Sequence, residues 1–457
     1  MKKCLSCCAV VFSLLLAASS LPEVRADVKL PNVFGSHMVL QRDRPLPVWG
    51  WADPGEEVAV KLDDATATVK ADAQGNWKVA LPAVKADGKA HSMTVSGKNK
   101  LALDDILIGD VWLGSGQSNM EMGITLCDKA KEQIPAANHP QVRLLLVPKV
   151  QTGRPAKDVK SKWVPCTPET VAAGGWGGFS AALYYFGLKV HKELNVPVGL
   201  IESAWGGSAI EPWTINGGSG GHMYNGMIAP VKPLAIRGTI WYQGESNAYQ
   251  RNGLAYYDKM KALIKGWRQA WGYDFPFYFV QIAPCAGYPN GQLPALWEAQ
   301  VASLKIPKTG MAVTTDLVAN IGDIHPIDKI DVGNRLALWA LAKEYGKKDL
   351  VYSGPLYKAM KIEGGKIRLS FAHVGGGLKS RDGKPLSEFQ IAAADGKFVP
   401  ARAAIDGDTV LVEAKEVPAP AQVRFGWHHM ANPNLANKEG LPASPFQTNT
   451  WQGGTGE

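Results

Sequence analysis

The middle of the chain alternates between short apolar runs and segments with helical spacing of apolar residues. The apolar runs lie at residues 110–113, 142–147, 198–201, 238–242, 277–282 and 311–315. Helical spacing marks residues 181–194, 254–267 and 329–345. Strands that alternate with helices are typical of a parallel sheet, because parallel neighbours need a crossover connection. We therefore expect an α/β fold for residues 106–346, with helices flanking the sheet.

The segments on either side have a different pattern. Residues 27–105 contain short strand-like runs, such as 58–62 and 77–81, separated by Gly, Pro and Asn. The same pattern returns in residues 347–457, for example at 409–413. Short strands at regular spacing predict β-sandwich regions at both ends of the chain. We expect the second region to pack beside the central domain, where it could complete the first.

The first 26 residues have the composition of a signal peptide. Lys2 and Lys3 precede an apolar run at residues 8–18, and small residues end the segment at Ala26. The run is shorter than the roughly 20 residues that a membrane-spanning helix needs. We expect cleavage before Asp27 and export to the periplasm or the medium, with no membrane insertion of the mature chain.

Cysteine content and charge exclude several classes of protein. After cleavage only three cysteines remain, too few for a disulfide framework, although one bridge between Cys127 and Cys166 is compatible with an oxidising compartment. No Cys/His spacing indicates zinc, so we expect neither a metal nor another cofactor. The formal net charge of +8 is spread along the chain, which argues against a nucleic-acid partner.

Polar loops follow four of the expected strands. Ser118 lies in the segment Gly-Gln-Ser-Asn-Met at residues 116–120, Gly206 and Gly207 follow the third strand, and Gln243 follows the fourth. His325 comes after the last strand. The carboxyl ends of parallel strands share one edge, so a hydroxyl, glycine N–H groups, an amide and an imidazole would meet there. These groups are the parts needed for acyl transfer, although Ser118 considered alone would favour a helix cap.

Several blocks of sequence, in this order, resemble the sialate O-acetylesterase family, a carbohydrate-esterase branch of the SGNH hydrolase superfamily. They are residues 38–42, 50–52, 109–112, 116–121, 241–245, 324–326 and 440–446. The resemblance covers nearly the whole mature chain. It implies an SGNH-hydrolase-like fold and hydrolysis of acetyl esters on sugars.

The resemblance also implies roles for matching residues. Ser118 has the role of the nucleophile and His325 that of the general base. The oxyanion hole would consist of the N–H groups of Ser118 and of Gly207 (or Gly206), together with the Gln243 side chain. The substrate of the protein would be an acetylated carbohydrate. The resemblance does not indicate an oligomeric state.

The chain departs from the superfamily pattern beside the histidine. The superfamily commonly has an Asp three residues before it, where this chain has Gly322, and Asp323 is two before. Asp323, Glu245 or a backbone carbonyl could each orient the imidazole, since any fixed acceptor sets the tautomer. Asn119, next to the serine, is a further candidate for support.

Four aromatic residues flank the loops that carry these groups: Trp205, Trp213, Tyr224 and Trp241. They are expected either to line a sugar pocket or to pack in the core.

Three functions remain at this point. The first is an O-acetylesterase acting on O-acetylated sialic acids. The second is the same chemistry on acetylated plant polysaccharides or oligosaccharides. The third is a non-catalytic carbohydrate-binding protein, which would have no use for Ser118, Gln243 and His325 together.

Overall fold

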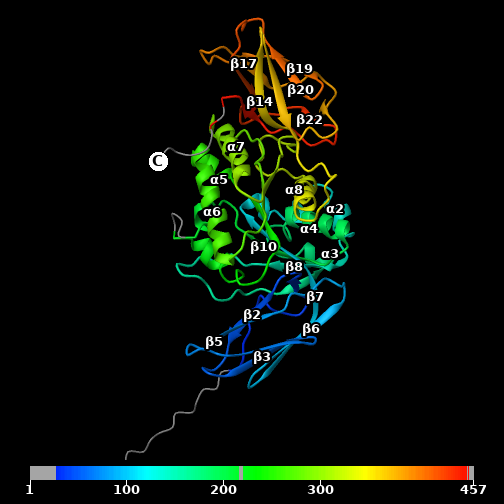
Figure 1. The fold of residues 1–457 in the computed structure, drawn as a ribbon, viewed down its shortest axis with the longest axis vertical. Coiled ribbons are helices and arrows are strands. Elements are labelled where there is room, and N and C mark those ends of the chain that lie inside the picture. The colour runs from blue at the N-terminus through cyan, green and yellow to red at the C-terminus, as the bar shows by residue number, and fades with distance from the viewer. Residues whose placement is uncertain (1–26, 216–219, 450, 452–457) are drawn as a thin grey trace, which may run out of the picture.

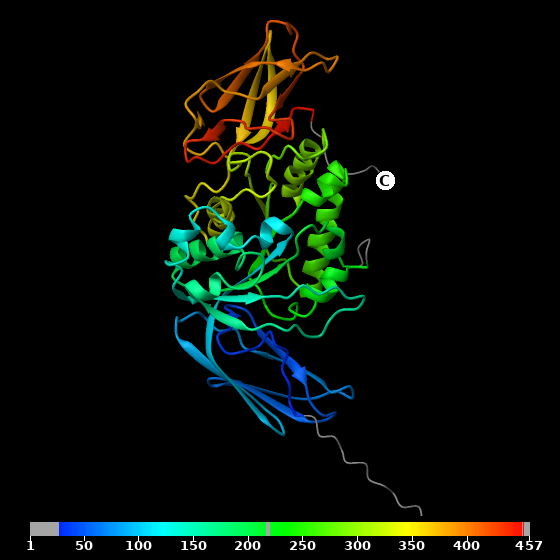
Figure 2. The ribbon, with the colours of Figure 1, turned by 180° about the vertical axis from the view of Figure 1, so that it is seen from behind.

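The computed structural model describes residues 27–215, 220–449 and 451 of the 457-residue chain. The predicted signal peptide lies outside these residues. The molecule is elongated, with the N-terminal β region at one end, the α/β domain in the middle and the C-terminal β region at the other end (Figure 1). The same arrangement is seen from behind in Figure 2. No helix in the described ranges is long and apolar enough to cross a membrane.

The central sheet has the strand order β13-β12-β11-β7-β10-β8-β9. The strands are β7 (Lys100–Gly116), β8 (His139–Leu146), β9 (Trp163–Cys166), β10 (Val198–Ala204), β11 (Gly238–Tyr242), β12 (Phe277–Val280) and β13 (Thr309–Ala312). All neighbours pair in parallel except β8 and β9. β10, β11 and β12 are buried along their whole length, as expected for parallel strands covered on both faces. The predicted parallel α/β fold is confirmed.

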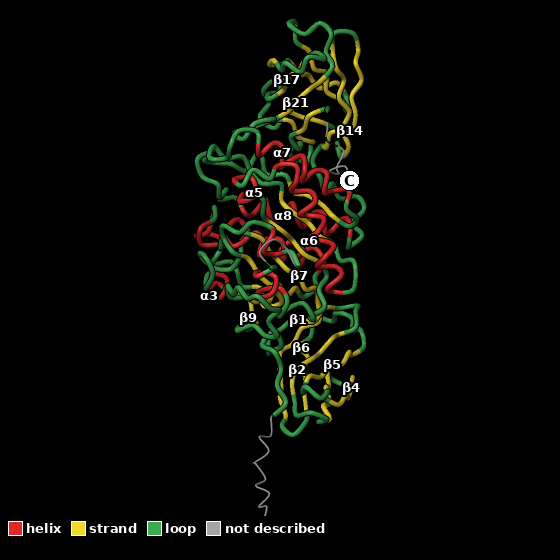
Figure 3. The backbone as a smooth tube through the Cα atoms, turned by 90° about the vertical axis from the view of Figure 1, so that its left-hand side faces the viewer, coloured by secondary structure: helices red, strands yellow, loops and turns green. Residues whose placement is uncertain are grey.

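Helices cover both faces of this sheet, as the tube view also shows (Figure 3). α4 (Ala181–Leu194) and α8 (Lys329–Lys343) pack against each other on one face. The other face carries α5 (Glu245–Tyr249), α6 (Tyr256–Trp271) and α7 (Gln292–Ala302). Three shorter helices of four residues each are also present: α1 (Ser118–Glu121), α2 (Ala130–Gln133) and α3 (Pro168–Val171).

Local sequence explains where the long helices begin and end. The Ser180 side chain accepts the Leu183 N–H at the start of α4, and Asn195 ends that helix in the left-handed conformation. Asp328 caps α8 in the same way as Ser180 caps α4. Gly272 ends α6 with a φ of 80°. These caps fix the chain direction into the loops that reach the sheet edge.

The N-terminal β region is joined to the central sheet by one strand. It contains β1 (Val39–Gln41), β2 (Leu46–Trp51), β3 (Glu57–Leu62), β4 (Ala65–Lys70), β5 (Asn76–Leu81) and β6 (Ala90–Ser96). The first half of β7 pairs with β6, and its second half pairs with β10 and β11. The predicted boundary between residues 105 and 106 therefore lies inside β7, beside Asp105, whose φ is 54°.

Buried charge reinforces this junction. Asp110 of β7 is fully buried and accepts hydrogen bonds from Gln41, Arg42 and Arg237. Burial alone would raise the pKa of the Asp110 carboxyl, but the two guanidinium groups and Gln41 lower it below its usual value. The N-terminal β region and the central sheet thus share one charged cluster.

The C-terminal β region forms two four-stranded sheets and a strand pair. One sheet is β14 (Leu356–Glu363), β15 (Lys366–Ala372), β20 (Thr409–Glu413) and β19 (Arg402–Asp406). The other is β18 (Val399–Pro400), β17 (Phe389–Ala392), β21 (Gln422–Phe425) and β23 (Phe446–Gln447), and β16 (Leu378–Ser380) pairs with β22 (Leu435–Asn437). The region has its own apolar core. It lies beside the central domain, as expected, but at the end opposite the N-terminal region, so the idea that it completes that region is wrong (Figure 1).

The cysteines do not form the bridge that the sequence allowed. Cys127 and Cys166 are both buried and free. Burial raises the pKa of each thiol to about 12, so both stay protonated at neutral pH. The disulfide expectation is corrected accordingly.

Candidate active site

Ser118 begins α1 at the carboxyl edge of the central strand β7. Gly116 ends β7 with a φ of +140°, and a Cβ there would lie 2.1 Å from the Tyr242 carbonyl oxygen, so only glycine fits. The Gln117 N–H donates to the same carbonyl at 3.0 Å. The helix-cap alternative for the Ser118 side chain is wrong, because Gln117 occupies the N-cap position and no side chain caps the helix.

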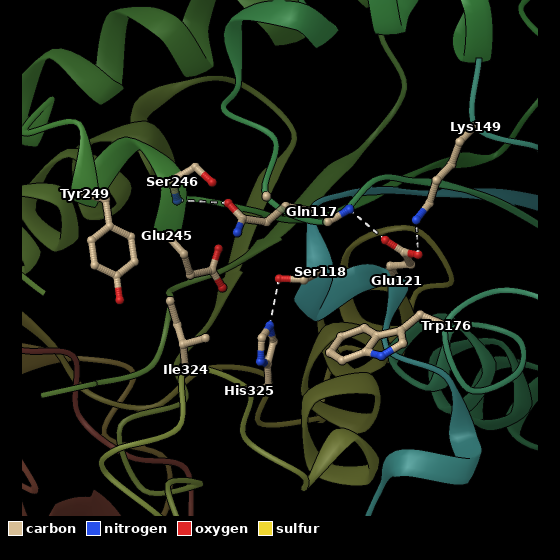
Figure 4. Close-up of a pocket in the computed structure, with 12 residues that line it drawn as sticks. Gln117, Ser118, Glu121, Lys149, Trp176, Glu245, Ser246, Tyr249, Ile324 and His325 are labelled. Atoms are coloured by element: carbon tan, nitrogen blue, oxygen red, sulfur yellow. Dashed lines mark hydrogen bonds and ion pairs between the residues drawn. The ribbon is translucent and has the colours of Figure 1, made fainter. Parts of the chain in front are cut away.

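His325 meets Ser118 from the loop between β13 and α8. Its Nε2 lies 2.9 Å from Ser118 Oγ (Figure 4). The edge-on ring of Trp176 lies 5.0 Å from the imidazole, measured between centroids. Burial lowers the pKa of His325 below its ordinary value, with Lys329 adding to the effect and Asp323 opposing it. A neutral imidazole beside a hydroxyl is able to accept its proton.

Asp323 is the carboxylate nearest the other imidazole nitrogen. Its Oδ1 lies 3.4 Å from His325 Nδ1 and also accepts the His325 backbone N–H at 2.9 Å. Half of the Asp323 side chain is exposed. Glu245, the rival candidate, is fully buried in α5 and contacts Asn119 instead.

Asn119 connects the serine helix to the histidine loop through a buried polar network. Its Nδ2 donates to Glu245 Oε1 at 2.6 Å and to the Ile324 carbonyl at 3.0 Å. Its Oδ1 accepts from Lys329 Nζ at 2.7 Å, and Lys329 also donates to the Pro326 carbonyl. Burial raises the pKa of Glu245 to about 7 and lowers that of Lys329 to about 8. Asn119 and Glu245 therefore lie together beneath the loop that carries His325, linked to it through the Ile324 carbonyl and Lys329.

The two glycines after β10 differ in what their N–H groups do. The Gly206 N–H donates to Glu121 Oε2 at 2.6 Å, and Glu121 also pairs with Lys149. Within the described part of the chain, no acceptor is present for the Gly207 N–H, and Gly207 lines the pocket with a φ of +72°. The Ser118 N–H, at the first position of α1, likewise has no acceptor in the ranges described. Of the two glycines, Gly207 is thus the one that can face an oxyanion.

Gln243 does not lie where the sequence placed it. Its side chain is fully buried beneath the pocket and does not line it. The Gln243 Nε2 donates to Gln117 Oε1, to the Ser208 carbonyl and to Asn247 Oδ1, at 3.1, 3.2 and 2.7 Å. Tyr256 donates to its Oε1 at 2.7 Å. All its polar groups are committed inside the protein, so the expected contact with an oxyanion is corrected.

None of the four aromatic candidates lines the pocket around Ser118. Trp213 and Trp241 are fully buried and pack edge to face in the core. Tyr224 lines a separate cavity beside the N-terminal β region. Trp205 is half-buried near Lys149, whose Nζ lies 5.9 Å from its ring centroid, and is not part of the pocket wall. Side chains next to a catalytic loop in sequence need not point into the site.

The aromatic walls of the pocket are two residues that the sequence analysis missed. Trp176 is 39% exposed and Tyr249 is 46% exposed, and both line the cavity around Ser118. Trp176 lies between two pairs of glycines, at 174–175 and 177–178. A tryptophan within a glycine-rich loop was the signal that the sequence offered for it.

The pocket that these residues form has a volume of about 560 Å³. It lies within the range of about 300–1,000 Å³ that small-molecule sites commonly have. Its lining combines the hydroxyl and imidazole with two aromatic rings and the cationic side chain of Lys149.

Comparison with known proteins identifies the family of this chain. The model of a family described as carbohydrate esterase, sialic acid-specific acetylesterase, matches residues 108–341. Human sialate O-acetylesterase is 31% identical over 390 residues, which cover 73% of this chain and 74% of that protein. The mouse sialate O-acetylesterase is 29% identical, covering 73% and 76%.

A solved structure extends the likeness to nearly the whole chain. The crystal structure of a carbohydrate acetylesterase from Xanthomonas citri is 41% identical, with a TM-score of 0.88, and covers 93% of this chain and 100% of that one. The predicted resemblance is confirmed: this chain belongs to the sialic acid-specific acetylesterase family of carbohydrate esterases.

Proposed function

We propose that this carbohydrate esterase works as a serine O-acetylesterase, with Ser118 as nucleophile and His325 as general base. The observation that carries the proposal is the distance of 2.9 Å between His325 Nε2 and Ser118 Oγ, two residues that line the same pocket. A carbohydrate-binding protein without catalysis would need neither that contact nor the unpaired N–H groups beside it.

The first half of the reaction forms an acetyl-enzyme. Ser118 Oγ attacks the acetyl carbonyl carbon while its proton passes to His325 Nε2. The N–H groups of Ser118 and Gly207 stabilise the negative oxygen of the tetrahedral intermediate. The bond between that carbon and the sugar oxygen then breaks, and Nε2 returns the proton to the sugar hydroxyl.

The second half releases acetate. A water molecule gives a proton to His325 Nε2 and attacks the acetyl carbonyl. The bond to Ser118 Oγ breaks, and the serine regains its proton from the imidazolium. Asp323 serves in each half by accepting from Nδ1 and stabilising the positive ring.

We further propose O-acetylated sialic acids as the substrate. The mammalian relatives are sialate O-acetylesterases. Sialic acid carries a carboxylate, and Lys149 supplies a cation at the pocket, 43% exposed although also paired with Glu121. Acetylated plant polysaccharides or oligosaccharides are the alternative within the same chemistry. The Xanthomonas citri relative is described as a carbohydrate acetylesterase without mention of sialate.

The test compares the purified protein with its Ser118→Ala variant. Acetate release is measured from O-acetylated sialic acids, acetylated plant oligosaccharides and p-nitrophenyl acetate. We expect release from all active substrates to fall by several orders of magnitude in the variant, with unchanged circular dichroism. A preference for plant oligosaccharides would overturn the assignment of sialic acids as the substrate but would leave the serine mechanism in place. No acetate from any ester would contradict the esterase proposal.

A further inference from the structure

We propose that the Gln117 side chain, not Gln243, supplies the amide donor of the oxyanion hole. The inference rests on the proposed serine mechanism and adds a catalytic residue to it. Gln117 directly precedes the nucleophile and lines the pocket, although only 3% of it is exposed. Its backbone is fixed by the N–H bond to the Tyr242 carbonyl.

Hydrogen bonds determine which end of the Gln117 amide faces the pocket. Its Oε1 accepts the backbone N–H of Ser246 at 3.1 Å and the Gln243 Nε2 at 3.1 Å. A backbone N–H can only donate, so the atom facing Ser246 has to be the oxygen. The nitrogen is therefore the other terminal atom of the side chain.

The orientation of Gln243 is fixed independently. The backbone carbonyl of Ser208 can only accept, and it lies 3.2 Å from the Gln243 nitrogen. The same nitrogen donates to Asn247 Oδ1, which also accepts the Ile210 backbone N–H at 3.0 Å. Each amide is thus held in one orientation by a backbone group of known polarity.

A charged pair anchors the far end of this row of amides. Asn247 Nδ2 donates to the Glu211 carboxylate at 3.1 and 3.3 Å. Lys259 donates to the same carboxylate. Asn247, Gln243 and Gln117 therefore form one rigid row, with Gln117 at the end nearest the nucleophile. Such a row costs no reorganisation when charge develops in the reaction.

The Gln117 amide nitrogen is left available for substrate. In the described part of the protein, it has no hydrogen-bond acceptor. Figure 4 shows it directed away from Ser246, on the side of the pocket where Ser118 Oγ lies. With the N–H groups of Ser118 and Gly207, it gives the tetrahedral oxygen a third donor. Gln243 then acts as a positioning residue that holds the Gln117 oxygen.

The experiment measures Gln117→Ala and Gln117→Glu on p-nitrophenyl acetate. Removing one oxyanion donor should lower kcat by about 10²–10³ with a smaller change in KM. Gln117→Glu keeps an oxygen for Ser246 but replaces the amide nitrogen with a second oxygen, so it should lose at least as much. The Gln117→Glu variant also provides the test if Gln117→Ala does not fold. Gln281→Ala is the matched control, because this buried glutamine directly follows β12, outside the pocket, and its amide contacts Ser444.

Binding of methyl trifluoromethyl ketone distinguishes a donor role of Gln117 from a purely structural one. The ketone forms a tetrahedral adduct with serine, so its affinity should fall in Gln117→Ala by a factor similar to the fall in kcat/KM, while acetate affinity stays within about tenfold. A kcat loss below about tenfold, a loss confined to KM, or unchanged ketone affinity would each overturn the assignment. An inactive wild type, or an active Ser118→Ala, would instead contradict the serine mechanism.

Discussion

The Asp323 carboxylate holds His325 at two points, through the backbone N–H at 2.9 Å and beside Nδ1 at 3.4 Å. One side chain therefore shapes the loop and faces the ring. In the proposed mechanism, Asp323 accepts from Nδ1, which keeps that nitrogen protonated and leaves Nε2 free to accept the Ser118 proton.

Replacing Asp323 with Asn should lower kcat by up to about 10⁴, because an amide can stabilise the wrong tautomer. The base must be neutral, so kcat/KM of the wild type should fall as the pH drops through the His325 pKa, which lies below the usual value of about 6.5. Asp323 raises that pKa, so its neutral replacement should move the fall to still lower pH. A pH series of kcat/KM measures both effects.

Glu245→Gln is the comparison for this variant. A glutamine oxygen can still accept from Asn119 Nδ2, so we expect a much smaller loss than in Asp323→Asn. A large loss in Glu245→Gln alone would move the orienting role to Glu245. Small losses in both variants would favour a backbone carbonyl as the acceptor.

Lys329→Met should destabilise the protein by about 3 kcal/mol or more, since it leaves Glu245 and two oxygens buried without their cation. Lys329 also lowers the pKa of His325, so the variant should shift the fall in kcat/KM to higher pH, opposite to Asp323→Asn. Urea unfolding and the same pH series test these expectations. Adding Glu245→Gln should recover part of the stability, and strictly additive effects would show that the two groups are not coupled.

Much of the fold could be predicted because apolar periodicity is a local property. Residues 181–194 and 238–242 were predicted as a helix and a strand with the bounds that the structure has. α7 was missed because Pro294 lies inside it and it is buried on nearly every side, so no polar face marks a helical period. The continuous strand β7 was read as shorter because its first half faces solvent at alternate positions.

The candidate site was predictable as far as strand ends determine it. Ser118 and His325 meet because both leave the same sheet edge. The sequence analysis named Gln243 alone as the amide donor, because the orientation of each glutamine amide depends on Ser208, Ser246 and other residues distant in sequence. Side-chain direction in a buried strand such as β11 is set by packing on both faces, which local patterns do not report.

Asp110→Asn tests the junction between the N-terminal β region and the sheet. The variant should lose about 3 kcal/mol of unfolding free energy, because Arg42 and Arg237 would lose their buried anion and keep only the half-exposed Asp43, 3.8 Å from each. The folded pKa of Asp110 is lowered, so its contribution is present above the unfolded value of about 3.9 and lost as the pH falls through the folded pKa. Thermal unfolding at neutral and acidic pH should show the two proteins converging in acid. A constant difference would contradict the role of the charge.

Trp176→Ala tests whether the exposed indole recognises the sugar. The ring forms a pocket wall beside His325, and burial of a stacked aromatic contact is worth about 0.5–1.5 kcal/mol. We expect KM for an acetylated sugar to rise by about 2–10-fold, with kcat less affected. Trp176→Phe keeps an aromatic face and should lose less. Methyl acetate, which has no sugar to stack, should show little change in kcat/KM with either variant. An equal loss with methyl acetate would mean that Trp176 acts on the imidazole and not on the sugar.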